Sequence, residues 1–286
     1  MTFRTMVGAA TMAAAMIVAV ATGVVGTAHA GGTGYTCSGG SASGPDPSAW
    51  TFVSIPSGTY SSLTVTGVCQ TMPGAVIQVV GDVNVAPGAV LDAQSFPSTI
   101  TVGRSLTAGA GSLLGLGCLP NPKGHTTGHP CVAAPGSKPN VSKSSITING
   151  HVRATNADTV LLDGISVRGN VRLVGGGGEI PWPIKDNTIG GNLVVSDMTP
   201  NWIGVVHNKI GQDAFLSNVN ITDGNPPNND PNPTIFISGN TVGWNLICVG
   251  LGPNVSGGFT GEVNAVGGQR LGQCANLPTF SPSAPH

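Results

Sequence analysis

The chain has 286 residues, of which only 8% are charged, and its formal net charge is −1. So little charge excludes a strong electrostatic attraction to nucleic acid or to an anionic membrane surface. Frequent, periodic Val, Ile and Leu argue against disorder, and 44 glycines with few aromatic residues are typical of short strands joined by tight turns.

Residues 1–30 have the features of a secretory signal peptide. Arg4 is the only charge before an almost unbroken Ala, Val, Met and Ile run from Val7 to Val25, and Ala28 and Ala30 flank a small-x-small cleavage site. A retained membrane anchor is the alternative, because the apolar run approaches the length of a span. We expect cleavage, and therefore a secreted, extracellular or cell-wall-associated protein with no membrane contact.

Residues 31–47 form a polar lead-in rich in Gly and Ser, and short β-branched stretches follow it. Each stretch covers three to six residues bounded by Gly, Asn, Asp or Pro, as short strands are. Examples are 62–66, 75–80, 99–102, 145–148, 159–162, 171–174 and 234–238. No segment after the signal has a 3.6-residue apolar period, so we expect essentially no helix.

A short pattern, Asn-x-(Ile/Val)-Gly-x-(Asn/Asp/Gln), recurs four times in the second half of the chain. Its copies begin at Asn187, Asn208, Asn240 and Asn264, in steps of 21, 32 and 24 residues. The long step contains a Pro/Asn-rich segment at 223–233, which resembles a loop inserted into one repeat. A fainter copy upstream has Ile165 in place of the leading Asn. A period of 21–24 residues predicts stacked coils, none of which can bury its apolar side alone.

The predicted fold is all-β: a single-stranded, right-handed parallel β-helix of about nine coils over residues 48–277. Insertions at 117–142 and 223–233 interrupt the repeat, and a polar tail covers 278–286. A β-sandwich also has short strands, but it gives no reason for one turn sequence to recur in every repeat. Stacked coils place equivalent residues in columns, so the four Asn residues predict a structural Asn ladder between coils.

All six cysteines follow the signal, and an even number in an exported chain indicates disulfides. The sequence leaves their connectivity open, because many pairings are possible. Proximity along the chain suggests Cys37–Cys69, Cys118–Cys131 and Cys248–Cys274. The last pair is about one coil apart and would join neighbouring coils near the C-terminal end.

The tandem repeats and the closing section resemble those of a family of uncharacterised exported actinobacterial proteins. The resemblance lies in 186–193 (DNTIGGNL), 239–248 (GNTVGWNLIC) and 267–274 (GGQRLGQC). It implies export, a right-handed β-helix and a Cys pair near the C-terminal end, and it implies no activity. The two Pro/Asn-rich insertions and the extra cysteines depart from the family, so we expect any added function there.

A polysaccharide lyase or glycoside hydrolase is the enzymatic alternative, because such enzymes resemble this architecture and act outside the cell. Clustered carboxylates on adjacent coils could bind Ca²⁺ or act as acid and base. Asp163 and Asp186 instead lie beside Gly164 and Asn187, where turn-forming carboxylates are expected. The candidate catalytic residues are Asp163, Asp186 and Asp213, with Arg168, Arg172 and Lys185 nearby.

Trp182 and Trp202 are 20 residues apart, close to one coil, and are the candidate binding residues. Stacked on one face, their indole rings would match the apolar faces of sugar rings. Ordinary packing over a coil edge is the alternative.

A metal site is suggested by His125 and His129 together with Cys118 and Cys131. Export favours pairing of the two thiols instead, so we predict no metal and no cofactor. Thr-x-Thr pairs at 64–66 and 99–101 are too few for an ice-binding face.

The predicted role is an exported, non-catalytic structural or binding module of the cell envelope or extracellular space, with a cell-wall or extracellular glycan as the candidate partner. The enzyme described above is the alternative. Self-assembly by end-to-end stacking is a third, because an uncapped terminal coil leaves strand edges open.

Overall fold

The computed structural model describes residues 32–44, 47–119, 131, 143–222, 233–258 and 261–279. The signal peptide, most of both insertions and the last residues of the tail lie outside this range. The metal hypothesis on His125 and His129 therefore also falls outside the described residues. No helix in the described ranges is long and apolar enough to cross a membrane.

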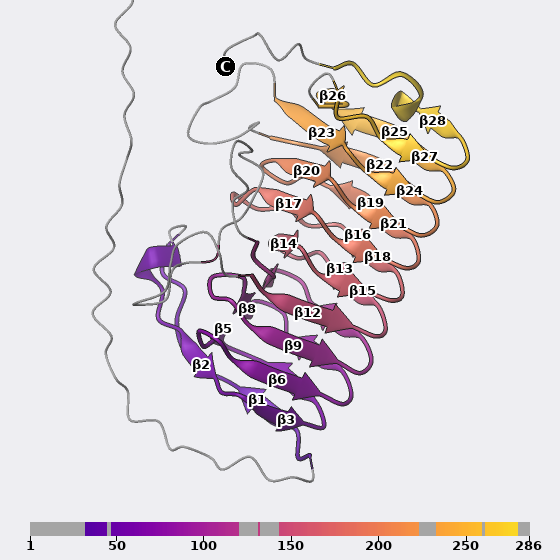
Figure 1. Ribbon diagram of the computed structural model, residues 1–286. Coiled ribbons are helices and arrows are strands. Elements are labelled where there is room, and N and C mark those ends of the chain that lie inside the picture. Colours follow the sequence, from indigo (N-terminus) through magenta and orange to yellow (C-terminus); the bar gives the residue numbers. More distant parts are fainter. Residues whose placement is uncertain are drawn as a thin grey trace, which may run out of the picture.

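Short parallel strands stack into three long sheets (Figure 1). Sheet 1 contains β1 (Tyr35–Cys37), β4 (Leu63–Val65), β7 (Val83–Val85), β10 (Leu106–Ala108), β13 (Val152–Thr155), β16 (Val171–Val174), β19 (Leu193–Met198), β22 (Ala214–Asn220), β25 (Leu246–Gly252) and β28 (Arg270–Gly272). Sheet 2 contains β2 (Val53–Ile55), β5 (Val68–Thr71), β8 (Val90–Ala93), β11 (Leu113–Leu116), β14 (Thr159–Asp163), β17 (Trp182–Lys185), β20 (Ile203–Val206), β23 (Thr234–Ser238) and β26 (Asn254–Ser256). Sheet 3 contains β3 (Gly58–Tyr60), β6 (Val76–Val79), β9 (Thr99–Val102), β12 (Ser145–Ile148), β15 (Ser166–Val167), β18 (Thr188–Ile189), β21 (Lys209–Ile210), β24 (Thr241–Val242) and β27 (Ala265–Val266).

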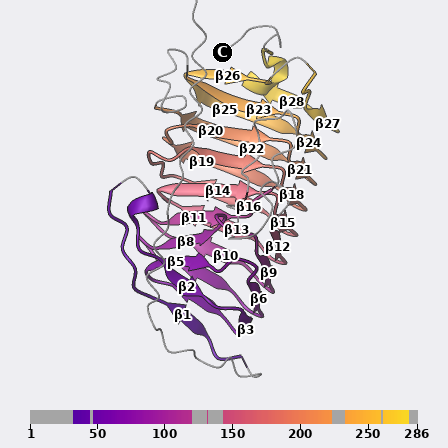
Figure 2. The ribbon, with the colours of Figure 1, turned by 60° about the vertical axis from the view of Figure 1, so that its left-hand side comes forward.

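The chain visits the three sheets in a constant order, so that β2, β3 and β4 make one coil and β26, β27 and β28 make the ninth. Figure 2 shows the coils stacked along a single axis. The prediction of a parallel β-helix of about nine coils is confirmed. Two coils are slightly shorter than expected, because Leu63 pairs with Val83 and Val152 pairs with Val171. In the described ranges, the helical elements are two short 3₁₀ turns, η1 (Pro47–Ala49) and η2 (Gln273–Asn276).

The core lies inside the three sheets and is built from columns of aliphatic side chains. Alternate residues of each strand point inward, and parallel register places like residues above one another. Burying each such Val, Leu or Ile stabilises the fold by about 1.5–3 kcal/mol relative to leaving it in water. The inward column of sheet 1 contains Leu63, Val83, Leu106, Val152, Val171, Leu193, Ala214 and Leu246.

The corner between sheets 2 and 3 uses the left-handed backbone region on successive coils. Gly164, Asp186, His207 and Gly239 occupy equivalent positions there, with φ of 70°, 55°, 56° and 64°. Glycine suits position 239, because a Cβ there would clash with the His207 ring.

The outer face of sheet 2 is covered near the N-terminal end. Trp50 and Phe52 pack there on a second apolar cluster that contains Val68, Val90 and Leu113, and η1 lies beside this sheet in both views (Figures 1 and 2). The stack of strands itself begins at β1, inside the expected polar lead-in, because β1 pairs with β4.

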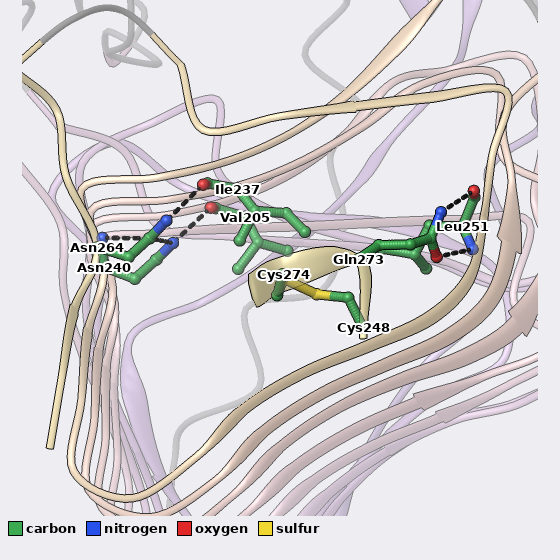
Figure 3. The surroundings of a disulfide bond; sticks show 8 residues. All are labelled: Val205, Ile237, Asn240, Cys248, Leu251, Asn264, Gln273 and Cys274. Carbon is green, nitrogen blue, oxygen red and sulfur yellow. Dashed lines mark hydrogen bonds between the residues drawn. A yellow bond between two sulfur atoms is a disulfide. The ribbon is translucent and has the colours of Figure 1, made fainter. Parts of the chain in front are cut away.

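The C-terminal end of the solenoid is closed by several caps. Cys274 in η2 is buried in the core, and a disulfide joins it to Cys248 (Figure 3). The Arg270 guanidinium donates to the Asn264 carbonyl. Gly257 N and Ser256 Oγ both donate to the Pro278 carbonyl, at 2.8 and 3.0 Å. Strand edges that would otherwise be open are thus partly covered at this end.

All three predicted disulfides are formed: Cys37–Cys69, Cys118–Cys131 and Cys248–Cys274. They indicate an oxidising compartment.

Candidate functional site

The four repeat Asn residues lie one above another at the start of the turn into sheet 3, and their side chains form a hydrogen-bonded ladder. Asn187 Nδ2 donates to Asn208 Oδ1 at 2.9 Å, and Asn208 Nδ2 donates to Asn240 Oδ1 at 3.0 Å. Asn240 Nδ2 donates to Asn264 Oδ1 at 2.9 Å (Figure 3). Ile165 N starts the ladder by donating to Asn187 Oδ1.

Each ladder amide also binds backbone. The second Nδ2 hydrogen of Asn208 reaches the Ile184 carbonyl at 2.8 Å, and its Oδ1 also accepts from Asn187 N at 3.1 Å. Every polar atom of this fully buried side chain therefore has a partner, as burial requires. The ladder is structural and leaves no amide group for a ligand.

A second polar column runs along the turn into sheet 1, at the sixth position of the repeat. In each case a side-chain acceptor takes the backbone N–H of the next coil at 2.8–3.1 Å. The acceptors in order are Asp82, Ser105, His151, Asn170, Asn192, Asp213 and Asn245. The pattern (Asn/Asp/Gln) at that position was the sequence signal for this column, which we did not predict.

One catalytic candidate, Asp213, belongs to this second polar column and has a structural role there. Asp213 Oδ1 accepts from both the backbone N and the Nδ2 of Asn245, each at 2.9 Å. Asp213 is thus a turn residue and lies in a different corner from Asp163 and Asp186. Arg168 is exposed after β15, and Arg172 is exposed on the outer face of sheet 1, so neither joins those carboxylates.

Asp163, Lys185 and Asp186 are brought together at the corner between sheets 2 and 3. Asp163 and Lys185 are paired across β14 and β17, and they are only 0% and 8% exposed. Burial lowers the pKa of Lys185, and the nearby Asp163 and Asp186 carboxylates oppose that shift. Because Asp163 and Lys185 are so little exposed, they are poorly placed to meet a polymer.

Two later coils add residues that the sequence analysis missed: His207 lies on the next coil, and Glu262 lies on the ninth coil, before β27. His207 Nδ1 lies 3.8 Å from Asp186 Oδ1, and His207 Nε2 lies 3.9 Å from Glu262 Oε1. Burial raises the pKa of Asp186, while His207 and Lys185 lower it in part. The three side chains are about one-third exposed. This acid–imidazole–acid row is the described arrangement that comes nearest to acid–base machinery.

The two tryptophans do not form a platform. Trp182 is 0% exposed in the core, and its Nε1 donates to the Asp158 carbonyl at 3.1 Å. Trp202 is half-buried outside sheet 2, where its ring lies over Gly204 and 6.1 Å from the Phe236 ring. A step of 20 residues is one short of the true register, because Trp182 on β17 pairs with Ile203 on β20. The two indoles therefore lie on different faces of the sheet.

A shallow groove of about 450 Å³ lies on the outer face of sheet 1, and we call it the sheet-1 groove. Its floor is the outward column Val194, Phe215 and Ile247, which are in register on β19, β22 and β25. Arg172 continues this column beyond Val194, and the polar rim contains Asn192, Ser196, Asp197, Asp213 and Ser217. Nearer the N-terminal end, the same column is polar, with Thr64, Asn84, Thr107 and Arg153.

A second hollow, the corner groove, has a volume of about 560 Å³ and lies between the lead-in and the turns from sheet 1 to sheet 2. It is lined by Gly44, Trp50, Asp158, Gly177, Gly178, Glu179, Ile180, Thr199, Asn201 and Thr222. Neither groove contains Asp163, Asp186 or His207. Over the described part of the chain, no cluster of three or more His, Cys, Asp or Glu side chains could hold a metal ion.

No protein-family model, no curated protein and no solved structure matches this chain.

Proposed function

We propose that this chain is an exported, non-catalytic structural and binding module whose partner is an extracellular glycan held in the sheet-1 groove. The observation that carries the proposal is the apolar column Val194, Phe215 and Ile247 between two polar rims. Three disulfides support an extracellular place of action.

The geometry of the column favours an extended sugar polymer. Equivalent side chains on neighbouring coils are about 4.8 Å apart, a spacing similar to the advance of one sugar ring in an extended chain. Sugar rings have an apolar face that packs on Phe215 and its aliphatic neighbours, and hydroxyls that meet the rim. Arg172 supplies donors, Asp197 supplies acceptors and Asn192 supplies both.

The surroundings of three candidate acid–base residues support a non-catalytic role. Asp213 already accepts two hydrogen bonds, and Asp163 and Lys185 are buried. A glycosidase needs two accessible carboxyl groups on either side of the scissile bond.

Binding is tested by electrophoresis of the oxidised chain through gels containing neutral polysaccharides, followed by calorimetry. We expect retardation by at least one polymer, and about tenfold weaker binding in Phe215→Ala. Val76→Ala, at an exposed site on sheet 3, is the matched control and should bind as wild type. Retardation by none of the polymers, or equal effects of the two variants, would contradict the proposal.

A second candidate function is polysaccharide cleavage, which the Asp186–His207–Glu262 row favours. The measurement is the release of reducing ends and unsaturated products from a polysaccharide panel, with and without Ca²⁺. Release that disappears in Asp186→Asn would make the protein an enzyme. No release across the panel, together with retardation in the gels, is the result we expect.

A further inference from the structure

Two arginines are stacked in register on the outer face of sheet 1. Arg153 on β13 pairs with Arg172 on β16, and both side chains are exposed. Neighbouring parallel strands are about 4.8 Å apart, so two like charges leave the sheet from adjacent backbone positions. Like charges directly opposite each other on a sheet are destabilising. An anion that binds both guanidinium groups offsets this repulsion.

The coils around this pair supply more positive charge. Arg104 and Arg168 are exposed in the turns that lead from sheet 3 into β10 and β16. Apart from Arg4 and Arg270, these two and the stacked pair are all the arginines of the chain, and they lie on three consecutive coils. Residues 93–157 contain no Asp or Glu. Positive charge is therefore concentrated in one band of a chain that has little charge.

The two carboxylates on the rim of the sheet-1 groove are already bound by amides. Asp197 Oδ1 accepts from Asn218 Nδ2 at 3.0 Å, and Asp213 is held by the two hydrogen bonds described above. The hydrogen bond from Asn218 lowers the pKa of Asp197 more than the charge of Arg172 does. In the described ranges, no salt bridge contains Arg153 or Arg172. Both guanidinium groups can therefore bind an external anion.

The arginine pair is continuous with the apolar floor of the groove. Arg172 pairs with Val194, and the same outward column continues through Phe215 to Ile247, one residue per coil. Arg172 also belongs to the lining of the groove. A polymer that lies along this column therefore meets two cations at one end and three apolar side chains beyond them.

We propose that the polymer bound in the sheet-1 groove is an acidic polysaccharide whose carboxylates are held by Arg153 and Arg172. This assignment rests on the proposed function, because it requires a glycan in that groove. A guanidinium group presents a planar fork of N–H donors that matches a carboxylate. The apolar column packs on the sugar rings beside those carboxylates. A chain of net charge −1 suits a few carboxylates at short range better than a densely charged nucleic acid.

The test compares acidic polymers with neutral forms of the same backbone. The two pairs are polygalacturonate with its methyl ester, and carboxymethyl cellulose with hydroxyethyl cellulose. Affinity electrophoresis and calorimetry of the oxidised chain give the ratio of the two affinities in each pair. In at least one pair we expect the acidic form to bind about tenfold tighter or more. The ratio should fall as salt is added, because exposed charges are screened.

Charge-removing variants locate the source of this ratio. Arg153→Gln and Arg172→Gln should each lower it, and the double variant should bring it to about one, because no guanidinium group is left in the column. Lys209→Gln is the matched control and should keep the wild-type ratio, because it removes an exposed positive charge from sheet 3 instead. Phe215→Ala should weaken binding of both forms and also keep the ratio, because it removes packing on the sugar rings and no charge.

The outcomes separate this proposal from the proposed function. Equal affinity for the acidic and neutral forms in both pairs would overturn the role of the arginine pair and leave glycan binding in place. A ratio that falls as far in Lys209→Gln as in Arg153→Gln would also overturn it. Binding of none of the four polymers would overturn the acidic-glycan assignment. If retardation in the neutral gels is absent as well, the proposed function fails with it.

Discussion

Gln273 gives Leu251 the two hydrogen bonds that a further strand would otherwise supply. Leu251 N donates to Gln273 Oε1 at 2.8 Å, and Gln273 Nε2 donates to the Leu251 carbonyl at 2.7 Å (Figure 3). β28 pairs with β25 only from Leu246 to Cys248, so the side-chain amide extends the sheet beyond the last paired backbone residue.

Replacement of this amide should loosen the C-terminal end. We expect Gln273→Ala to cost about 1–2 kcal/mol of unfolding free energy and to speed hydrogen exchange at Leu251 N, since both backbone groups lose a partner. Denaturant unfolding and exchange measured by NMR check this. Gln269→Ala, at an exposed neighbouring position, is the control, and equal protection of Leu251 in both variants would refute the role of Gln273.

Loss of a ladder amide should be more costly. Asn208→Ala removes the partner of Asn187 N and of the Ile184 carbonyl inside the core, and it leaves Asn187 Nδ2 with its bond to the Leu162 carbonyl alone. With about 1–3 kcal/mol for each unsatisfied buried group, we expect a loss of at least about 3 kcal/mol. Asn84→Ala, on the exposed face of sheet 1, should cost less than about 0.5 kcal/mol. Thermal unfolding of the two variants under the same conditions measures both losses of stability. Equal losses would show that burial of the ladder amide is not the cause.

The Cys248–Cys274 disulfide should add stability beyond that of the hydrogen bonds around it. Removing Cys248 and Cys274 together by substitution with Ala should cost about 2–4 kcal/mol, because the unfolded chain is no longer constrained. Denaturant unfolding checks the magnitude, and hydrogen exchange at Leu251 should rise as well, since η2 is then held only by side-chain contacts. A change below about 0.5 kcal/mol would show that the caps suffice without the bond.

The sequence repeat predicted more of the fold than of the site. A turn pattern that recurs four times implies that equivalent residues stack in columns, once the inserted loop at 223–233 is left out of the long step. The column of Asn187, Asn208, Asn240 and Asn264 follows from it directly. The short strands were found from β-branched alternation, because parallel coils bury one side of each strand. Proximity along the chain suggested the cysteine pairs, and of the three only Cys248–Cys274 has a separation close to one coil.

The candidate site was harder to predict, because side-chain direction depends on register at the level of single residues. Trp182 and Trp202 differ in phase by one residue, which places one in the core and the other outside. Asp186 and His207 come together because both occupy a left-handed corner, a feature that the local sequence does not mark. The corner groove joins Gly44 and Trp50 to turns more than 100 residues later, and no repeat connects them.

Asp186 should make stability depend on pH in the acidic range. Burial raises its pKa above the ordinary value of 3.8, so the folded chain binds this proton more tightly than the unfolded chain does. Its contribution therefore favours folding fully below pH 3.8 and is lost as the pH rises through the raised pKa. We expect Asp186→Asn to match wild type at low pH and to gain up to about 1 kcal/mol near neutrality, a small value because the carboxyl is partly exposed.

Thermal unfolding of wild type and Asp186→Asn across the acidic range provides the measurement. Asn tolerates the left-handed backbone at this position, so the substitution changes charge with little strain. A stability difference that does not change with pH would contradict the raised pKa.

The two end disulfides have a mechanical consequence. Cys37–Cys69 closes a ring over residues 38–68, and Cys248–Cys274 closes another over residues 249–273. A solenoid stretched along its axis yields from its ends inward, because each coil is held only by its neighbours. Here covalent rings hold the outermost coils, and tension cannot draw out their residues until a sulfur–sulfur bond is cut. Under load, the rod therefore behaves as a stack of interior coils between two locked ends.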